Sequence, residues 1–351
     1  MGKSTTTTPS LHLKMTRTIH PVGQGAFYSE TISDKNNIPV FTAVYDCGGK
    51  VDLLSNEIDK LSRVDIVFIS HFHCDHINRV QELIKRFKPG KVVFPQVSAG
   101  HFFVDFVFNC ARDKNREFLS SMLHFLPILR LAESGNANDL RIDNTLYVPI
   151  KSPNLRGKPF PSKLLLWEYI AFYNENVSSV QTLEKELYPL FGLSDDSLIK
   201  FQEKSFYEKI ARRLKDDERL LEKVKEAYSK AFHRCHNSYS MIVLSRQIDK
   251  IRIEDKKFDC LYTGDVSVDN WVLGVASTYE PDYIQVPHHG SNHNHNSYLY
   301  TCSNIVFVSV GITNRYRHPG LITLPNIINT CKEVHIVTED NTTRLKRSIL
   351  F

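Results

Sequence analysis

The sequence predicts an α/β fold built from two groups of strands with a mainly helical stretch between them. Strand and helix patterns alternate as far as about residue 150, helical periodicity alone runs from about 154 to 232, and strand patterns return from residue 240. A chain of 351 residues can bury a large core. We therefore expect a flexible N-terminus at 1–15 and one catalytic domain at 16–351, which carries a helical insertion at about 154–232.

The first half of the chain alternates short apolar runs with helical patterns. β-branched and aromatic residues predict strands at 18–22, 41–45, 64–70, 91–95 and 145–149. The first of these leads into a glycine turn and a returning strand. Apolar residues at helical spacing predict helices at 53–61, 77–87 and 104–131, the last kinked or interrupted at Pro127.

The second group of strands is expected after the helical stretch and makes a second half-sheet plausible. Its predicted members are 240–245, 258–262, 283–286, 304–310 and 334–337. Within the helical stretch, one apolar face is made by Leu220, Leu221, Val224, Tyr228 and Ala231. The charged residues beside this face are either a solvated surface or a guide for a substrate or partner.

Composition excludes several classes of protein. Apolar residues make up 42% and charged residues 24% of the chain, values typical of globular proteins. No apolar run is long enough to cross a bilayer, and the start lacks the apolar stretch of a secretory signal, so a cytoplasmic location is expected. The seven scattered cysteines, without a C-x-x-C pair, argue against a disulfide framework or a cysteine zinc site. The net charge of +5 suits a polyanionic substrate but falls short of a dedicated nucleic-acid binder.

Histidines are concentrated in a few places, which suggests metal binding. Ten of the fifteen fall at 71/73/76, 233/236, 288/289/293/295 and 318. His71, His73, Asp75 and His76 directly follow a buried strand, on a loop that leads into a helix. The alternative is a polar surface loop, but four potential ligands within six positions favour a site with two nearby divalent ions, Zn²⁺ or Mn²⁺.

Further polar residues follow later strands. Asp265 ends a strand at Thr-Gly-Asp and has two oxygens with which it could bridge two metals. His288 and His289 also end a strand; one could bind metal while the other contacts substrate or acts as an acid. His318 lies near Arg315 and Arg317, whose guanidinium groups fit phosphate oxygens, although exposed arginines are common.

These residues resemble the metallo-β-lactamase superfamily. Its H-x-H-x-D-H motif is matched by His71, His73, Asp75 and His76, its first aspartate motif resembles Asp46, and its bridging aspartate resembles Asp265. The resemblance implies an αββα sandwich and a dinuclear metal site. The implied ligands are His71, His73, Asp75, His76, His236, Asp265 and His288, with His236 as the third ligand of the first ion.

A closer resemblance is to the soluble hydrolase domain of the DNA-uptake channel protein ComEC and its free-standing relatives. Their patterns V-G-Q-G, N-x-x-S, T-G-D, P-H-H-G-S and S-V-G-x-x-N-x-Y-x-H-P appear here at 22–25, 237–240, 263–265, 287–291 and 309–319. Three departures stand out. Ala26 and Phe27 replace aspartate and alanine, Arg317 replaces the glycine before His318-Pro319, and the helical insertion has no counterpart in the core pattern.

The sequence therefore predicts a hydrolase with two divalent metal ions. A hydroxide held between the metals, bridged by Asp265 and oriented by Asp75, would attack the substrate, and His289 or His318 would supply a proton. Asn237, Arg315 and Arg317 are the expected substrate-binding residues. The leading substrate is a phosphodiester, DNA or a nucleotide-like diester; the alternatives are a small ester, lactone or thioester, or a non-catalytic scaffold that binds a protein partner through the helical insertion.

Overall fold

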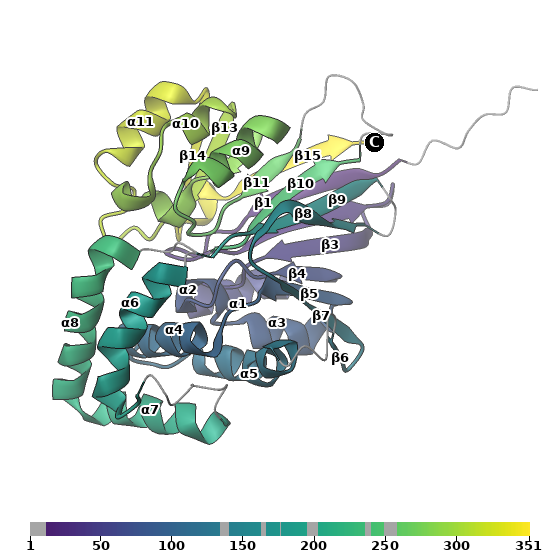
Figure 1. The fold of residues 1–351 in the computed structure, drawn as a ribbon. Helices are drawn as coiled ribbons and strands as arrows, with labels where there is room; N and C mark the ends of the chain where they lie inside the picture. Colours follow the sequence, from purple (N-terminus) through teal and green to yellow (C-terminus); the bar gives the residue numbers. More distant parts are fainter. Residues whose placement is uncertain are drawn as a thin grey trace, which may run out of the picture.

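Two β-sheets lie face to face, with helices on both outer faces (Figure 1). The computed structural model describes residues 12–133, 140–162, 166–175, 177–194, 203–235, 240–248 and 258–351. Helices α1 to α5 cover the first sheet, and α9 to α11 cover the second. This four-layer arrangement confirms the predicted αββα sandwich.

The first sheet has eight strands in the order β15-β1-β2-β3-β4-β5-β7-β6. Their bounds are β1 Lys14–Ile19, β2 Tyr28–Ser33, β3 Pro39–Tyr45, β4 Ile66–Phe68, β5 Lys91–Pro95, β6 Leu140–Ile142, β7 Thr145–Ile150 and β15 Leu345–Leu350. Strands β3, β4, β5 and β7 run parallel, so their carboxyl ends meet at one edge.

The second sheet has seven strands in the order β14-β13-β12-β11-β10-β9-β8. Their bounds are β8 Asn154–Pro161, β9 Trp167–Tyr173, β10 Ile242–Gln247, β11 Cys260–Tyr262, β12 Tyr283–Gln285, β13 Ile305–Ser309 and β14 Glu333–Val337. Strands β11 to β14 are parallel, and the chain then returns to the first sheet as β15. The two sheets thus share the aromatic core in which the rings of Tyr45 and Tyr262 stack at 5.0 Å.

The helices fall into three sets. The first sheet carries α1 Val51–Asp59, α2 Cys74–Ile77, α3 Val80–Phe87, α4 Ala99–Arg112 and α5 Leu119–Glu133. The second carries α9 Asn270–Tyr279, α10 Tyr298–Thr301 and α11 Thr323–Thr330, and the third set is α6 Val177–Leu187, α7 Lys204–Asp216 and α8 Glu218–Cys235. Helices α6, α7 and α8 all contact α4, and their buried residues join its hydrophobic core. None of the described helices is long and apolar enough to span a membrane.

The expectation of helix alone across 154–232 is wrong at its beginning. Residues Asn154–Pro161 and Trp167–Tyr173 form β8 and β9 at the end of the second sheet, and helix begins only at Val177. β9 is buried along nearly all of its length, so its apolar residues show no strand alternation. Short apolar runs of this kind do not distinguish strand from helix by periodicity.

The predicted helix at 104–131 is two helices, and its break lies before Pro127. α5 runs through Pro127, whose neighbours Leu126 and Ile128 are both buried. The break between α4 and α5 is a turn in which the Asp113 carboxylate accepts hydrogen bonds from the backbone N–H groups of Asn115 and Glu117. An aspartate that binds its own following backbone competes with helix formation.

Candidate metal centre

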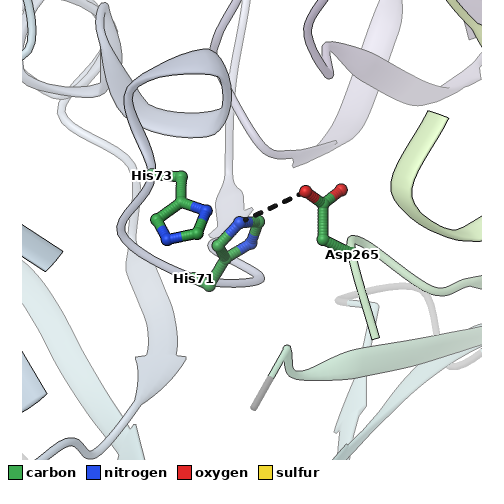
Figure 2. Close-up of side chains that lie close together, drawn as sticks. All are labelled: His71, His73 and Asp265. Carbon is green, nitrogen blue, oxygen red and sulfur yellow. Dashed lines mark ion pairs between the residues drawn. The ribbon is translucent and has the colours of Figure 1, made fainter. Parts of the chain in front are cut away.

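The predicted metal-binding residues gather where the carboxyl ends of parallel strands from both sheets meet. The metal loop, Ser70–His76, follows β4; Asp265 follows β11, and His288 and His289 follow β12. Two groups of side chains place ligand atoms within 4.8 Å of one another: His71, His73 and Asp265, and Asp75, His76 and His289. Figure 2 shows the first group, with the imidazoles of the metal loop facing the carboxylate from the other sheet.

Ser70 and Asp46 orient the imidazoles of His71 and His76 through contacts with their Nδ1 atoms. Asp46 is fully buried, and its carboxylate accepts hydrogen bonds from the Ser70 backbone and hydroxyl, both at 2.7 Å. The other Asp46 contact is His76 Nδ1 at 2.8 Å, while Ser70 Oγ lies 2.9 Å from His71 Nδ1. Because Nδ1 of each ring is engaged, Nε2 of each ring faces Asp265, the arrangement typical of metal-binding histidines.

Asp265 faces both groups with different oxygens. Its Oδ1 lies 3.1 Å from His76 Nε2 and 3.9 Å from His289 Nε2. Its Oδ2 lies 3.7 Å from Nε2 of both His71 and His288. One carboxylate therefore stands between two sets of imidazoles.

The charges of the centre favour ionised carboxylates. Burial would raise the pKa of Asp265, but His76 and His288 hold it well below its ordinary value. Burial acts in the same direction on Asp75, where Arg112 and His76 hold the pKa low. Buried, anionic oxygens among imidazole nitrogens are a donor set that fits a divalent cation.

His71 and His76, two of the three histidines of the metal loop, have opposite pKa shifts. Burial lowers the pKa of His71, and the neighbouring His76 and His73 lower it further. Burial also acts to lower the pKa of His76, but Asp265 and Asp46 outweigh it and raise the value well above 6.5. A positive charge is therefore most strongly stabilised at His76, between the two carboxylates.

The loop after β12 has an unusual backbone that orients its two histidines. His288 and His289 have φ angles of 48° and 51°, in the left-handed region. His289 Nδ1 donates to the Ser309 carbonyl at 2.7 Å, and its Nε2 lies 3.8 Å from Asp75 Oδ2. His289 is therefore a candidate ligand of the second group, beside its expected role as an acid. The less buried His288 approaches Asp265 at 3.7 Å. Strained backbone of this kind is concentrated at functional sites.

Two glycines allow the backbone segments around the centre to approach closely. A Cβ on Gly48 would lie 2.1 Å from the Asp75 carbonyl oxygen. Gly264, just before Asp265, has a φ of 56°, and a Cβ there would lie 2.7 Å from Ser70 Cβ. Any larger residue at either position would push the metal loop away from its partners.

Helix α4 supplies a polar stripe that sequence reasoning missed. His101, Asp105, Asn109 and Arg112 recur at helical spacing within an otherwise apolar helix. The Asn109 amide donates to the Phe72 carbonyl at 2.7 Å and accepts from the Cys74 N–H at 2.8 Å, and so fixes the backbone of the metal loop. The helical spacing of these residues is visible in the sequence, but it does not show which structure the stripe faces.

The two ends of the stripe contact the metal groups directly. Asp105 Oδ1 lies 3.5 Å from His73 Nε2, and its Oδ2 lies 3.7 Å from His101 Nε2. His101 Nδ1 in turn contacts Glu175 Oε1 at 2.5 Å. At the other end, Arg112 Nη2 lies 3.4 Å from Asp75 Oδ2.

The remaining predicted residues lie at the rim or outside the described chain. The His318 ring lies 5.6 Å from that of His288 and stacks 6.4 Å from that of His289. Burial, and then the two facing histidines, lowers the pKa of His318 to about 3, so its imidazole is neutral near pH 7. Arg315 and Arg317 are exposed on the same loop. The predicted third ligand His236 and the predicted substrate contact Asn237 lie outside the described residues.

A sequence model of the metallo-beta-lactamase superfamily matches residues 41–114. This segment contains β3, the metal loop and α4, and the match supports membership of the superfamily. No curated protein matches the sequence.

Solved structures with a similar arrangement share little sequence with this chain. The metallo-beta-lactamase fold protein YhfI from Bacillus subtilis is 10% identical, with a TM-score of 0.46, over 96% of this chain and 100% of that chain. Unliganded yeast PDE1 is 11% identical, with a TM-score of 0.42, over 97% of this chain and 99% of that chain. A long form RNase Z from yeast is 11% identical, with a TM-score of 0.36, over 85% of this chain and 36% of that chain.

Proposed function

We propose that this chain, with a superfamily match across its metal loop, is a hydrolase that uses two divalent metal ions, Zn²⁺ or Mn²⁺, to cleave phosphodiesters. The observation that carries the proposal is the position of Asp265. Its two oxygens face different imidazole sets, at 3.1 Å from His76 and 3.7 Å from His71. A carboxylate placed in this way suits a bridge between two ions, each with its own histidines.

Each residue of the centre has a distinct role in the proposed reaction. When bound, two divalent ions lower the pKa of water and offset negative charge in the transition state. Asp75, ionised and close to Arg112, would orient the attacking water through its carboxylate. His289, with Nδ1 bound to the Ser309 carbonyl, or His318 at the rim would hydrogen bond to the leaving oxygen.

A phosphodiester is the substrate class that the charge of the centre favours. The chain carries a net charge of +5, and Arg112 and Arg315 lie on the side of the centre occupied by Asp75. The similarity of its motifs to ComEC-type hydrolase domains supports DNA or a nucleotide-like diester in particular. A neutral ester, lactone or thioester would have less need of guanidinium groups at this position.

The test is hydrolysis of bis(p-nitrophenyl) phosphate and single-stranded DNA in the presence of Mn²⁺ or Zn²⁺. We expect Asp75→Ala and His76→Ala to abolish a metal-dependent rate that His335→Ala retains, since His335 pairs with Glu333 on β14. Equal rates in all four proteins would contradict catalysis at this centre. A protein partner bound through α6 to α8 with no hydrolysis would favour the scaffold alternative.

Metal content provides an independent measurement. Metal-replete protein should hold two equivalents by mass spectrometry, and less than one would contradict a dinuclear centre. Removal of the metal with a chelator should lower the Tm, because a ligand present at about 1,000 times its Kd stabilises a folded protein by about 4 kcal/mol.

A further inference from the structure

We propose that Arg112, Arg315 and Tyr316 form an anion clamp that grips the phosphoryl group of the substrate beside Asp75. The three side chains come from the end of α4 and from the loop after β13, and they meet at the Tyr316 hydroxyl. This inference rests on the proposed phosphodiesterase function and deepens it. It identifies the groups that select a phosphoryl centre over a neutral acyl centre.

Arg112 is held in place before any substrate arrives. Its guanidinium lies 4.9 Å from the ring centre of Phe108 and 5.0 Å from that of Tyr316. Nε donates to the Tyr316 hydroxyl at 3.0 Å, while Nη2 approaches Asp75 at 3.4 Å. The side chain is 20% exposed, so one part of the planar group still faces the solvent side of the centre. A preorganised guanidinium of this kind suits the fork of two phosphate oxygens.

Arg315 completes the clamp from the opposite element. Its Nη2 donates to the same hydroxyl at 2.7 Å, and its guanidinium lies 5.0 Å from the Tyr316 ring centre. A phenolic oxygen has two acceptor positions and one hydrogen. Because the two arginines fill both acceptor positions, the hydrogen of Tyr316 is left to donate to an incoming oxygen.

The charge of the clamp matches an anion. Within the described part of the chain, Asp75 is the carboxylate that approaches Arg112, and Arg315 has no carboxylate within 4.0 Å. Asp75 is also a candidate metal ligand, so a bound cation would share its charge. Two guanidinium groups with one shared carboxylate leave a net positive charge beside the metal centre, which a phosphoryl oxygen would offset.

The clamp adjoins the second metal group. The Tyr316 ring lies 5.7 Å from that of His318, which stacks on His289. A phosphoryl group that contacts the clamp would therefore lie next to Asp75 and His289, where the proposed reaction takes place.

The experiment combines two substrates with one ligand, using metal-replete protein. Arg112→Ala, Arg315→Ala and Tyr316→Phe are compared with the wild type and with Arg130→Ala, an exposed arginine on α5. The readouts are kcat/KM for bis(p-nitrophenyl) phosphate, kcat/KM for the neutral ester p-nitrophenyl acetate, and the affinity for inorganic phosphate by calorimetry.

We expect each arginine variant to weaken phosphate binding and diester kcat/KM by about 10- to 100-fold, the range for a lost charge-assisted hydrogen bond. The Tyr316→Phe loss should be smaller, about 3- to 10-fold, since a neutral donor is removed. Hydrolysis of the neutral ester should change little in Arg315→Ala and Tyr316→Phe, which a general loss of folding or metal would not allow; Arg112→Ala also removes a contact of Asp75 and so should affect both substrates. Arg130→Ala should match the wild type throughout.

Two results would overturn the clamp. If only Arg112→Ala had an effect, Arg112 would act solely by positioning Asp75, because Arg315 and Tyr316 do not touch that carboxylate in the described contacts. If the wild type cleaved the diester and all variants bound phosphate equally, the clamp proposal would be contradicted, but the proposed function would not. Conversely, phosphate binding that depended on Arg315 in a protein without diesterase activity would support the clamp and contradict the proposed function.

Discussion

Two of the buried polar clusters among the described residues balance their charges in different ways. The inter-sheet cluster is centred on Arg17 of β1 and Glu30 of β2, which are 1% and 2% exposed. Arg17 Nε donates to Glu30 at 2.7 Å and Nη2 donates to the Phe258 carbonyl at 2.8 Å, while Tyr262 donates to Glu30 at 2.9 Å. One cation and one anion balance within the protein itself.

The charges of the side chains in the metal centre do not balance in this way. Asp46 and Asp265 are buried and Asp75 is partly buried beside them, and among the described contacts Arg112 is the guanidinium that approaches Asp75. The other ionisable groups described there are imidazoles; burial opposes their protonation, although Asp265 and Asp46 outweigh this effect at His76. We interpret the inter-sheet cluster as a contribution to the stability of the fold, whereas the donor set of the metal centre is one that a bound divalent cation would complete.

The largest expected effect is on stability, from Arg17→Met. The substitution leaves Glu30 buried without its cation, and breaking a buried pair in this way costs about 3–5 kcal/mol. Urea unfolding measured by circular dichroism would give the change. The double variant Arg17→Met/Glu30→Gln should recover much of the loss, and folded Arg17→Met should still bind two metal equivalents. A loss below about 1 kcal/mol would contradict the importance of the inter-sheet cluster.

Asp265→Asn should impair activity and metal binding instead of stability. Loss of the bridging carboxylate should reduce diesterase activity by more than about 100-fold, the upper end of the range for outer-shell changes. Metal content should fall below two equivalents, as mass spectrometry would detect. Retention of both ions and of activity would contradict a role of Asp265 as a metal ligand. Glu30→Gln is the control for loss of a buried carboxylate elsewhere.

The comparison also explains what the sequence could predict. The local sequence places His71, His73, Asp75 and His76 together after the single strand β4, so a common site could be predicted for them. Asp265 could be proposed because it ends a strand at Thr-Gly-Asp and matches the resemblance to the superfamily, but its position beside the metal loop depends on the packing of two different sheets.

The rest depended on tertiary structure. Asp105 and Arg112 act on the metal loop from a helix about 30 residues away in sequence, and their stripe is ambiguous until the direction of α4 is known. The orientation of His289 toward Asp75 depends on left-handed backbone at 288–290, which propensity does not predict for histidine. The sequence pattern did not reveal β9 as a strand, because both of its faces are buried and apolar residues do not alternate with polar ones.

Asp105→Asn tests whether the polar stripe of α4 acts on the centre. Asp105 contacts His73 Nε2 at 3.5 Å, so it would orient the ring and raise the basicity of its other nitrogen. We expect metal affinity or activity to fall by about 10- to 100-fold, measured by competition with a chromogenic chelator. Glu175→Gln, one contact further away at His101, should have a smaller effect. An equal effect of both variants would indicate a general packing role for the stripe.

The smallest expected effect comes from Arg317→Gly, which restores the residue found in the ComEC-like pattern. Arg317 has a φ of 57°, a conformation that costs a residue with a Cβ about 1–2 kcal/mol. Glycine removes this cost but adds about 0.4–1 kcal/mol of unfolded-state entropy, so we expect a net gain in stability of up to about 1 kcal/mol. Thermal unfolding compared with Arg317→Ala separates the two contributions, because alanine keeps the Cβ and should bring no gain. A loss of stability in the glycine variant would mean that the arginine side chain itself stabilises the rim, and would make Arg317 part of the same polar network as Arg315 and Tyr316.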